Sequence, residues 1–315
     1  MKILITGGAG FIGGHLAEAA LAKGWDVCVV DDLSTGRIEN VPSAATLRQV
    51  DIRDDAALQL VFDEFRPDLV SHQAAQASVA ISVREPQLDA QINVIGSLNV
   101  MRAAAATGVG RFVFASTGGA IYGEVPEGVR ASVETPPVPL SPYACSKFAV
   151  EKYLEAFRIE HGLDYTILRY ANVYGPRQDP HGEAGVVAIF CQRLFRGDPI
   201  QVNARREAGD PGCVRDYVYV SDVVGANIAA CEGRIPDRVL NIGTGVETTT
   251  QQLADFLKER LQSSSKVGSG PNRAGDVERS LLDADRLIEL LGAPVALHEG
   301  LSRTADWFAR AAQAG

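Results

Sequence analysis

A tyrosine and a lysine four positions apart are the residues of this chain best suited to moving a proton. Tyr143 and Lys147 lie in the stretch SPYACSK at 141–147, where Ser141 is a good helix N-cap and Pro142 suits the first helical position. A helix that begins there places the tyrosine and the lysine on one face. A phenol with a pKa of about 10 is a poor base at neutral pH, but a neighbouring cation stabilises the phenolate and lowers the pKa. The pair is therefore a candidate general base with its electrostatic partner; the alternative is an exposed helical pair that contributes little.

Two hydroxyl groups stand at the end of the apolar run 111–116. Ser116 and Thr117 would lie at the carboxyl edge of a parallel sheet, which is where α/β proteins bind ligands. A hydroxyl at that edge could pass a proton between a substrate and Tyr143. Hydroxyls at strand ends are also common turn formers, which is the alternative.

Three glycines near the start of the chain predict a phosphate site. Gly7, Gly10 and Gly13 follow an apolar run at 3–5 and lead into a helical pattern from Phe11. A strand that turns tightly into a helix directs unpaired N–H groups and the positive end of the helix dipole at one point, which suits a pyrophosphate. The glycines permit the turn, the approach of the phosphates and close helix–strand packing. We therefore predict a dinucleotide site; the alternative is a turn with a purely structural role.

The carboxylate of Asp31 bears on which dinucleotide binds. It ends the apolar run 26–31, 18 positions after Gly13. A carboxylate there accepts hydrogen bonds from both ribose hydroxyls and repels a 2′-phosphate, so NAD is favoured over NADP. Arg37 weakens this exclusion slightly, and an acid that caps its own loop is the alternative. An oxidised nicotinamide would add a second cation near Tyr143, and a pKa shift of about 3 units would bring the phenol into the neutral range.

Alternating strands and helices must position these residues. Apolar runs spaced by helical patterns indicate an α/β fold with a doubly wound parallel sheet, a Rossmann fold, with helices on both faces. The expected strands are 3–5, 26–31, 47–51, 68–72, 111–116 and 165–170, with a later run at 238–242, and the expected helices are 11–23, 54–65, 89–106 and 141–160.

The pattern loosens after Asn172, where segments rich in Gly, Pro and Asp separate short helices. We expect an NAD-binding Rossmann domain over 1–172, with 214–243 returning to it. A smaller, partly interleaved C-terminal α/β lobe over 173–213 and 244–315 would bind the substrate. The cleft between two such lobes is the expected ligand site.

The composition argues against nucleic acid or a membrane as the main partner. The chain is 46% hydrophobic and 22% charged, as is ordinary for globular proteins, and its net charge is −9. Five cysteines without a C-x-x-C pair indicate reduced thiols, no signal peptide precedes the first strand, and no apolar run has membrane-spanning length. We therefore expect a cytoplasmic protein. Five scattered histidines predict no metal site.

Six motifs in order give the chain a resemblance to a known family. It resembles the extended short-chain dehydrogenases/reductases, and among them the UDP-glucose 4-epimerases, from Met1 to about residue 300. The motifs are TGGAGFIG at 6–13, DDLSTG at 31–36, HQAAQ at 72–76, STGGAIYG at 116–123, SPYACSK at 141–147 and RYANVYGPRQ at 169–178.

The resemblance implies a role for each matching residue. Thr117 would be the catalytic hydroxyl, Tyr143 the base, and Lys147 its electrostatic partner and a nicotinamide-ribose ligand. Because the STGG stretch is one residue longer than in some epimerases, the choice between Thr117 and Ser116 stays open. The other implied cofactor-binding residues are Gly7, Gly10, Phe11, Ile12, Gly13, Asp31, Asp32, Ser34, Thr35, Gly36, Asp51, Ile52, Gln73, Ala74, Ala75, Asn93, Ser116 and Tyr170. The implied substrate-binding residues besides Thr117 are Asn172, Val187, Arg215, Arg273, Asp276 and Ser280.

The activity implied is epimerisation at C4 of a UDP-hexose. Tyr143 would take the proton of the sugar 4-OH through Thr117 while hydride passes from C4 to NAD. The 4-keto sugar would then turn over and receive the hydride on its other face, so that NAD is regenerated and stays bound. Dehydratases and decarboxylases of the family carry acidic residues directly after the catalytic threonine. Gly118 and Gly119 stand there in this chain, which disfavours both reactions.

More than one substrate and more than one reaction are compatible with the sequence. Ser280 is small where some family members have tyrosine, which would leave room for an N-acetyl group, so UDP-GlcNAc and UDP-GalNAc are expected beside UDP-glucose and UDP-galactose. A UDP-hexuronate 4-epimerase, a nucleotide-sugar reductase and a non-catalytic dinucleotide sensor are the other candidate functions. The resemblance also implies a homodimer formed through the helices near 89–106 and 143–160.

Overall fold

The computed structural model describes residues 1–180, 185–272 and 277–314, without the side chains of 312–314, and it divides into two compact units. The first unit comprises Met1–Thr117, Pro139–Arg169 and Val223–Leu240, and the second comprises Gly118–Val138, Tyr170–Asp222 and Asn241–Gly315. Residues 118–138 thus group with the second unit, whereas the expected boundaries include them in the first.

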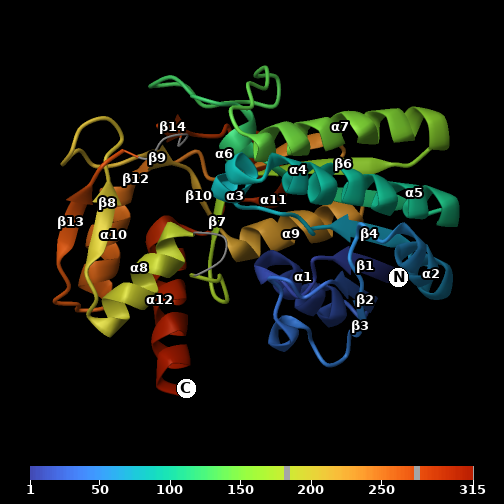
Figure 1. Cartoon of the computed structure of the whole chain (residues 1–315), viewed down its shortest axis with the longest axis horizontal. Coiled ribbons are helices and arrows are strands. Elements are labelled where there is room, and N and C mark those ends of the chain that lie inside the picture. Colours follow the sequence, from blue (N-terminus) through green and yellow to red (C-terminus); the bar gives the residue numbers. More distant parts are fainter. Residues whose placement is uncertain (181–184, 273–276, 315) are drawn as a thin grey trace. The chain divides into compact units, whose positions relative to one another are not determined.

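A seven-stranded sheet organises the first unit, and Figure 1 labels its strands β1, β2, β3, β4 and β6. The strand order is β11-β6-β5-β4-β1-β2-β3. The pairs β1–β2, β1–β4, β2–β3 and β4–β5 are parallel. Because β1 lies between β2 and β4, the winding reverses there, as the predicted Rossmann fold requires. The strands are β1 (Lys2–Thr6), β2 (Asp26–Asp31), β3 (Thr46–Gln49), β4 (Leu69–His72), β5 (Arg111–Thr117), β6 (Tyr165–Tyr170) and β11 (Val239–Ile242). The predicted return of 238–242 to the sheet is confirmed.

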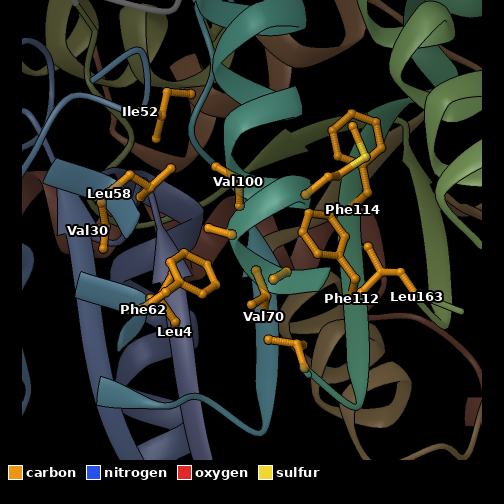
Figure 2. Close-up of a cluster of buried hydrophobic side chains, with 14 of the residues drawn as sticks. Leu4, Val30, Ile52, Leu58, Phe62, Val70, Val100, Phe112, Phe114 and Leu163 are labelled. Carbon is orange, nitrogen blue, oxygen red and sulfur yellow. The ribbon is translucent and has the colours of Figure 1, made fainter. Parts of the chain in front are cut away.

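Apolar side chains of the strands pack against helices over one face of this sheet. Leu4, Val70, Phe112 and Phe114 form a buried cluster with Phe62 and with further side chains of α2, α5 and α7 (Figure 2). Successive strand residues point to opposite faces, so Ile3 and Ile5 serve the other face. The helices of the first unit are α1 (Phe11–Ala22), α2 (Asp55–Phe65), α3 (Val79–Arg84), α4 (Pro86–Ala90), α5 (Ser97–Thr107), α7 (Pro142–His161) and most of α9 (Val220–Cys231).

The helix expected over 89–106 is interrupted by a π-helical segment. α4 continues into Gln91–Gly96, where the helix is of the π type, and then into α5. The expected helix is present over this range, but its π-helical segment was not predicted, because six residues are too few for a change of helical period to show in the apolar pattern. Such segments are typical of functional sites, and Asn93 lies within this one.

The second unit contains small sheets with the orders β12-β9-β14, β10-β7 and β13-β8. Its strands are β7 (Asn172–Tyr174), β8 (Ile200–Asn203), β9 (Val214–Arg215), β10 (Tyr217–Tyr219), β12 (Thr248–Thr249), β13 (Val267–Gly270) and β14 (Arg279–Ser280). Its helices are α6 (Gly118–Ile121), α8 (Val186–Arg196), α10 (Thr250–Arg260), α11 (Asp285–Leu291) and α12 (Leu297–Ala314).

Candidate active site

The start of α7 presents the tyrosine and the lysine as the sequence predicts. The Ser141 hydroxyl caps the helix by accepting from the Ala144 N–H at 3.3 Å, and Pro142 occupies the first turn. Lys147 is only 4% exposed, and its Nζ donates to the carbonyl of Ala115 at 2.9 Å. The same Nζ lies 6.0 Å from the ring centroid of Tyr143. The lysine is therefore a buried cation beside the phenol and not half of an exposed pair.

The two neighbouring hydroxyls at the end of β5 are not equivalent. The Ser116 hydroxyl donates to Oε1 of Glu151 at 2.5 Å, and Glu151 is in turn bound by Arg169. Thr117, which is 8% exposed, is the last residue of the strand. The proton of Ser116 is thus committed to a carboxylate, which favours Thr117 as the hydroxyl that relays a proton.

The glycine turn has the form that a phosphate requires. Gly7 has a φ of +67°, and a Cβ on it would lie 2.6 Å from the backbone N of Ala74. A Cβ on Gly13 would lie 2.2 Å from the carbonyl O of Gly7, so α1 can pack this close to β1 only with glycine there. In the part of the chain that the structure describes, no side chain caps α1 at Gly10. The unpaired N–H groups of the first helical turn suit an anion, so this turn fits the pyrophosphate of NAD.

Asp31 lies at the predicted edge, at the carboxyl end of β2. Its Oδ2 accepts from the Ala9 N–H at 3.0 Å and its Oδ1 from the Leu33 N–H at 2.9 Å. Burial raises the pKa of the Asp31 carboxyl above its ordinary value, and the hydrogen bonds from Leu33 and Ala9 oppose that rise. A Cβ on Gly36 would lie 2.5 Å from Oδ1, so glycine is needed where this loop passes the carboxylate. The site accordingly offers a buried carboxylate beside the glycine turn, which fits an adenosine ribose.

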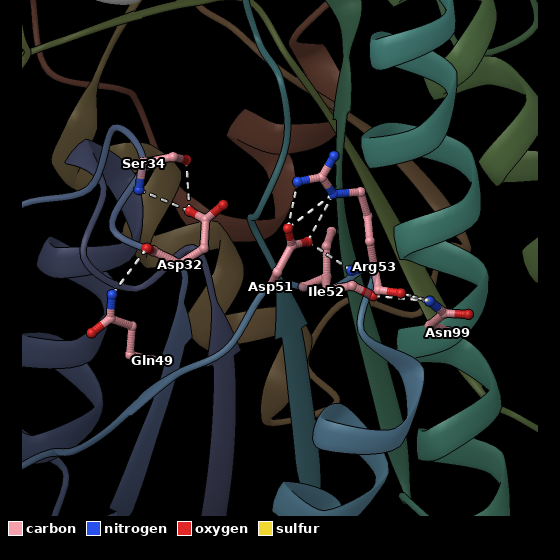
Figure 3. A network of polar contacts seen from close by, with 7 residues as sticks. All are labelled: Asp32, Ser34, Gln49, Asp51, Ile52, Arg53 and Asn99. Atoms are coloured by element: carbon pink, nitrogen blue, oxygen red, sulfur yellow. Dashed lines mark hydrogen bonds and ion pairs between the residues drawn. The ribbon is translucent and has the colours of Figure 1, made fainter.

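Polar contacts fix the loops that follow β2 and β3, where the predicted adenine-side residues lie (Figure 3). Asp32 Oδ1 accepts from both the N–H and the hydroxyl of Ser34. Hydrogen bonds from Arg53 hold the pKa of Asp51 below its usual range. The carbonyl of Ile52 accepts from Asn99 at 3.0 Å. Thr35 lies in the bend after Ser34.

The residues after β4 lie at the same edge of the sheet, since Thr6 pairs with His72 in the register of β1 and β4. Gln73 donates from its N–H to the Thr6 carbonyl at 3.1 Å, and Ala74 donates to the Thr6 hydroxyl at 3.2 Å; Ala75 follows. Asn93 is 2% exposed. Its side-chain oxygen accepts from the Gln76 N–H, and its side-chain NH2 group donates to the Gln76 carbonyl. The structure therefore brings the predicted residues of β1, β4 and the π segment into one connected region.

Three predicted substrate residues are linked within the second unit. Asn172 donates its N–H and its side-chain amide to the carbonyl of Asp216, at 3.0 and 3.1 Å. Asp216 also donates its own N–H to the carbonyl of Ser280 at 3.0 Å, and Arg215 pairs with Ser280 in the register of β9 and β14. Asn172 and Ser280 thus both bind the backbone of Asp216, which directly follows Arg215 in the chain.

Of the remaining predicted residues of the second unit, two are buried and two lie outside the residues that the structure describes. Val187, 1% exposed in α8, and Tyr170, 6% exposed at the end of β6, are buried. Arg273 and Asp276 lie outside the described residues.

Two carboxylates with central positions were missed by the sequence analysis. Glu151 lies four residues after Lys147, so the spacing Tyr143, Lys147, Glu151 along one helix face was a usable signal. Asp216 stands between Arg215 and Tyr217, and an acid beside an arginine resembles a surface pair. Its burial at 1% exposure becomes visible only in the fold.

A pocket of about 330 Å³ in the second unit is separate from these residues. Val214 and Arg279 line it, and they pair across β9 and β14. Because neighbouring strand residues face opposite ways, Arg215 and Ser280 point away from this pocket. Two ion pairs lie in it, Arg279 with Glu247 and Arg206 with Glu278, and we assign it no ligand.

No group of three or more His, Cys, Asp or Glu side chains suited to a metal ion occurs among the described residues. No helix in the described ranges has the length and apolar character needed to cross a membrane.

Comparison with known proteins gives matches over almost the whole chain. Residues 3–243 match the model of the NAD dependent epimerase/dehydratase family. The chain is 42% identical over 319 residues to a UDP-glucose 4-epimerase of Mycolicibacterium smegmatis, covering 99% of this chain and 100% of the relative.

Two solved structures are similar in both sequence and fold. A Thermus thermophilus UDP-glucose 4-epimerase in complex with NAD is 50% identical, with a TM-score of 0.95 over 98% of this chain and 99% of that one. A Thermotoga maritima UDP-glucose 4-epimerase with UDP-glucose is 48% identical, with a TM-score of 0.93 over 99% of this chain and 100% of that one.

Proposed function

Because the chain belongs to the NAD dependent epimerase/dehydratase family, we propose that it interconverts the C4 epimers of a UDP-hexose with NAD as a resident cofactor. UDP-glucose and UDP-galactose are the proposed pair, since the relatives similar over nearly the full chain are UDP-glucose 4-epimerases. The observation that carries the proposal is the buried Lys147, whose Nζ is fixed by the Ala115 carbonyl and lies beside the Tyr143 ring.

The residues at the end of β5 and the start of α7 would move the proton. Tyr143, as phenolate, accepts the proton of the sugar 4-OH through the hydroxyl of Thr117, and returns it when the sugar is reduced again. Lys147 stabilises the phenolate by its charge and lowers the pKa of the phenol. Bound NAD supplies a hydride acceptor and donor for C4. A single proton path thereby serves both directions of the reaction.

The glycine turn and Asp31 would hold the cofactor. Gly7, Gly10 and Gly13 leave space and N–H groups for the pyrophosphate, and Asp31 accepts from the adenosine ribose. Asp51 and Ile52 flank adenine in this assignment, Gln73, Ala74, Ala75 and Asn93 line the cofactor channel, and Tyr170 lies against the nicotinamide. The acceptance of NAD rather than NADP rests on the negative charge of Asp31.

The second unit would hold the UDP group. Asn172 and Arg215 are assigned to it, together with Val187, Arg273 and Asp276, so that the nucleotide stays anchored while the 4-keto sugar turns over. Guanidinium groups suit the diphosphate because they donate two parallel hydrogen bonds. Ser280 is assigned to the sugar, where its small side chain leaves room for N-acetylated substrates.

A dimer and a cytoplasmic location complete the proposal. Ile95, Tyr153 and Ile159 are 51%, 43% and 67% exposed on the helices proposed as the dimer interface. Apolar side chains left in solvent on adjacent helices favour association with a second copy. All five cysteines are free thiols, which supports a reducing compartment.

The test is to incubate the purified protein with single UDP-sugars without added NAD and to resolve the products. Conversion between C4 epimers without net cofactor change is expected. Stoichiometric consumption of a nicotinamide would instead favour a reductase, and turnover restricted to UDP-hexuronates would favour the hexuronate epimerase.

A further inference from the structure

We propose that Ser116 is a positioning residue, which with Glu151 and Arg169 anchors the end of β5 so that the neighbouring hydroxyl of Thr117 is held in its place for proton transfer. This inference rests on the proposed function. Ser116 itself would touch neither the sugar nor the phenol.

The anchor consists of a buried ion pair, Glu151 with Arg169, and the hydroxyl of Ser116, which is hydrogen-bonded to the carboxylate. Glu151 is 4% exposed and Arg169 is 5% exposed. Oε1 of Glu151 accepts from the Ser116 hydroxyl at 2.5 Å and from Nε of Arg169 at 3.0 Å. Oε2 of Glu151 accepts from Nη2 of Arg169 at 2.6 Å. The two-point contact between guanidinium and carboxylate fixes the orientation of the Glu151 side chain. A buried hydroxyl bound to so rigid an acceptor is itself immobilised.

The spacing along α7 shows what the anchor is for. Tyr143, Lys147 and Glu151 are four residues apart in turn and therefore lie along one face of the helix. Lys147 binds the carbonyl of Ala115, and Glu151 binds the side chain of Ser116. Two successive residues of β5, Ala115 and Ser116, are thus hydrogen-bonded to α7, the helix that carries Tyr143.

Thr117 is the next residue and the last of the strand. Its backbone can move relative to Tyr143 only if one of these two hydrogen bonds lengthens. A misplacement of about 1 Å can cost a reaction two orders of magnitude in rate. The anchor therefore sets the geometry of the proton path without taking part in it.

The direction of the Ser116 hydrogen bond excludes a direct role for this residue. A proton relay must accept a proton from the sugar hydroxyl while donating its own to the phenolate. The proton of Ser116 points at a carboxylate that also accepts from Arg169, so it is not available to Tyr143.

A double-mutant cycle on Ser116 and Thr117 tests the proposal. The variants are Ser116→Ala, Thr117→Ala and the double substitution, with kcat expressed per bound NAD and KM measured for the same UDP-sugar. Ser82→Ala is the matched control, because Ser82 is also fully buried but donates only to a carbonyl of its own helix. It should leave kcat unchanged. Replacing Glu151 would leave a buried guanidinium without its carboxylate and destabilise the fold, so the test uses the serine.

We expect Ser116→Ala to lower kcat about tenfold with little change in KM or NAD content, and to have no further effect once Thr117 is alanine. An equal factor in both backgrounds would show that the serine acts independently of the threonine and would overturn the proposal. So would an unchanged kcat, or a larger loss from Ser116→Ala than from Thr117→Ala.

A structural readout separates this inference from the proposed function. If the wild-type protein turns over no UDP-sugar, the proposed function fails and the cycle has no rate to report. Crystal structures of the wild type and of Ser116→Ala then decide the anchor. A shift of residues 115–117 relative to α7 in the variant supports it, and an unmoved strand end refutes it.

Discussion

The imidazole of His72 and the hydroxyl of Thr6 lie 2.6 Å apart in the interior of the first unit, at Nδ1 and Oγ1. The Thr6 hydroxyl accepts from the Ala74 N–H and keeps its own proton available for Nδ1. On the other side of the ring, the Ser97 hydroxyl donates to the Asn93 carbonyl and so accepts from Nε2 at 2.8 Å. The contacts define a neutral imidazole with its proton on Nε2, which links β1, β4 and the π segment.

This neutral histidine predicts a loss of stability in acid. Burial, and secondarily the charge of Lys147, lowers the pKa of His72 from 6.5 to about 3. Between these values the unfolded chain binds a proton that the folded chain does not, so the free energy of unfolding falls as the pH drops from about 6.5 to 3. The contribution is on the order of 1.4 kcal/mol per pH unit at its steepest. Denaturant unfolding of wild type and His72→Asn across this range measures it, and equal slopes for the two proteins would contradict it.

Removing the Tyr143 hydroxyl should abolish turnover and leave the cofactor in place. Tyr143→Phe keeps the ring beside Lys147 but removes the group that accepts the proton, so kcat should fall roughly 100- to 10,000-fold. NAD content, measured after denaturing the purified protein, should match that of the wild type. Turnover close to the wild-type rate would take the tyrosine out of its proposed role.

Gly7→Ala should prevent NAD from binding. The new Cβ would meet the Ala74 backbone at 2.6 Å, and the turn can relieve this contact only by opening. Gly24→Ala is the control, because Gly24 has a similar φ of +73° but nothing within 4 Å of a Cβ. Both variants carry backbone strain of roughly 1–2 kcal/mol. Only the first should lose bound NAD, and equal losses in the two would attribute the effect to strain alone.

Local patterns predicted the first unit well because its elements obey short-range rules. The bounds of β2 and β6 coincide with the apolar runs 26–31 and 165–170, and α7 begins at its capping serine and proline. The helix over 89–106 was predicted without its π segment, since a segment of six residues is too short for a changed helical period to show in the apolar pattern.

Polar contacts between residues far apart in the chain could not be predicted from the sequence. Ser116 and Glu151 are 35 residues apart in the chain, and the spacing of Glu151 after Lys147 does not indicate which side chain it meets. The site residues at strand ends could be predicted because a parallel sheet gathers them at one edge, as the register of Thr6 with His72 illustrates. Which of two adjacent hydroxyls is bound by a carboxylate depends on tertiary packing, and the sequence left that choice open.

Ser280→Tyr should change the choice of sugar. Ser280 is 2% exposed, and we propose that its small side chain leaves room for an N-acetyl group at C2. A tyrosine would fill that room, so kcat/KM for UDP-GlcNAc should fall at least about tenfold relative to that for UDP-glucose. Ser280→Ala, which stays small, should keep the wild-type ratio. The proposal fails if the tyrosine variant has the same ratio as the wild type.

Asp216→Asn should weaken UDP binding without releasing NAD. The carboxylate accepts from the N–H and hydroxyl of Thr244 at 2.8 and 2.7 Å and from the Gly245 N–H at 3.0 Å. An asparagine would turn an NH2 group toward one of these donors, which leaves buried groups unsatisfied at a cost of about 1–3 kcal/mol.

Asp216 also binds Asn172 and Ser280 through its backbone, so a shift of Asp216 would displace these two residues, which are assigned to the UDP-sugar. The dissociation constant for UDP, measured by calorimetry, should rise several-fold while NAD content stays constant, because the glycine turn belongs to the first unit. Asp283→Asn is the control, since Asp283 is only partly buried and its carboxylate accepts from the N–H of Asp285, two residues further along the chain. An unchanged UDP affinity in Asp216→Asn, with the protein folded, would show that the carboxylate does not position the substrate residues.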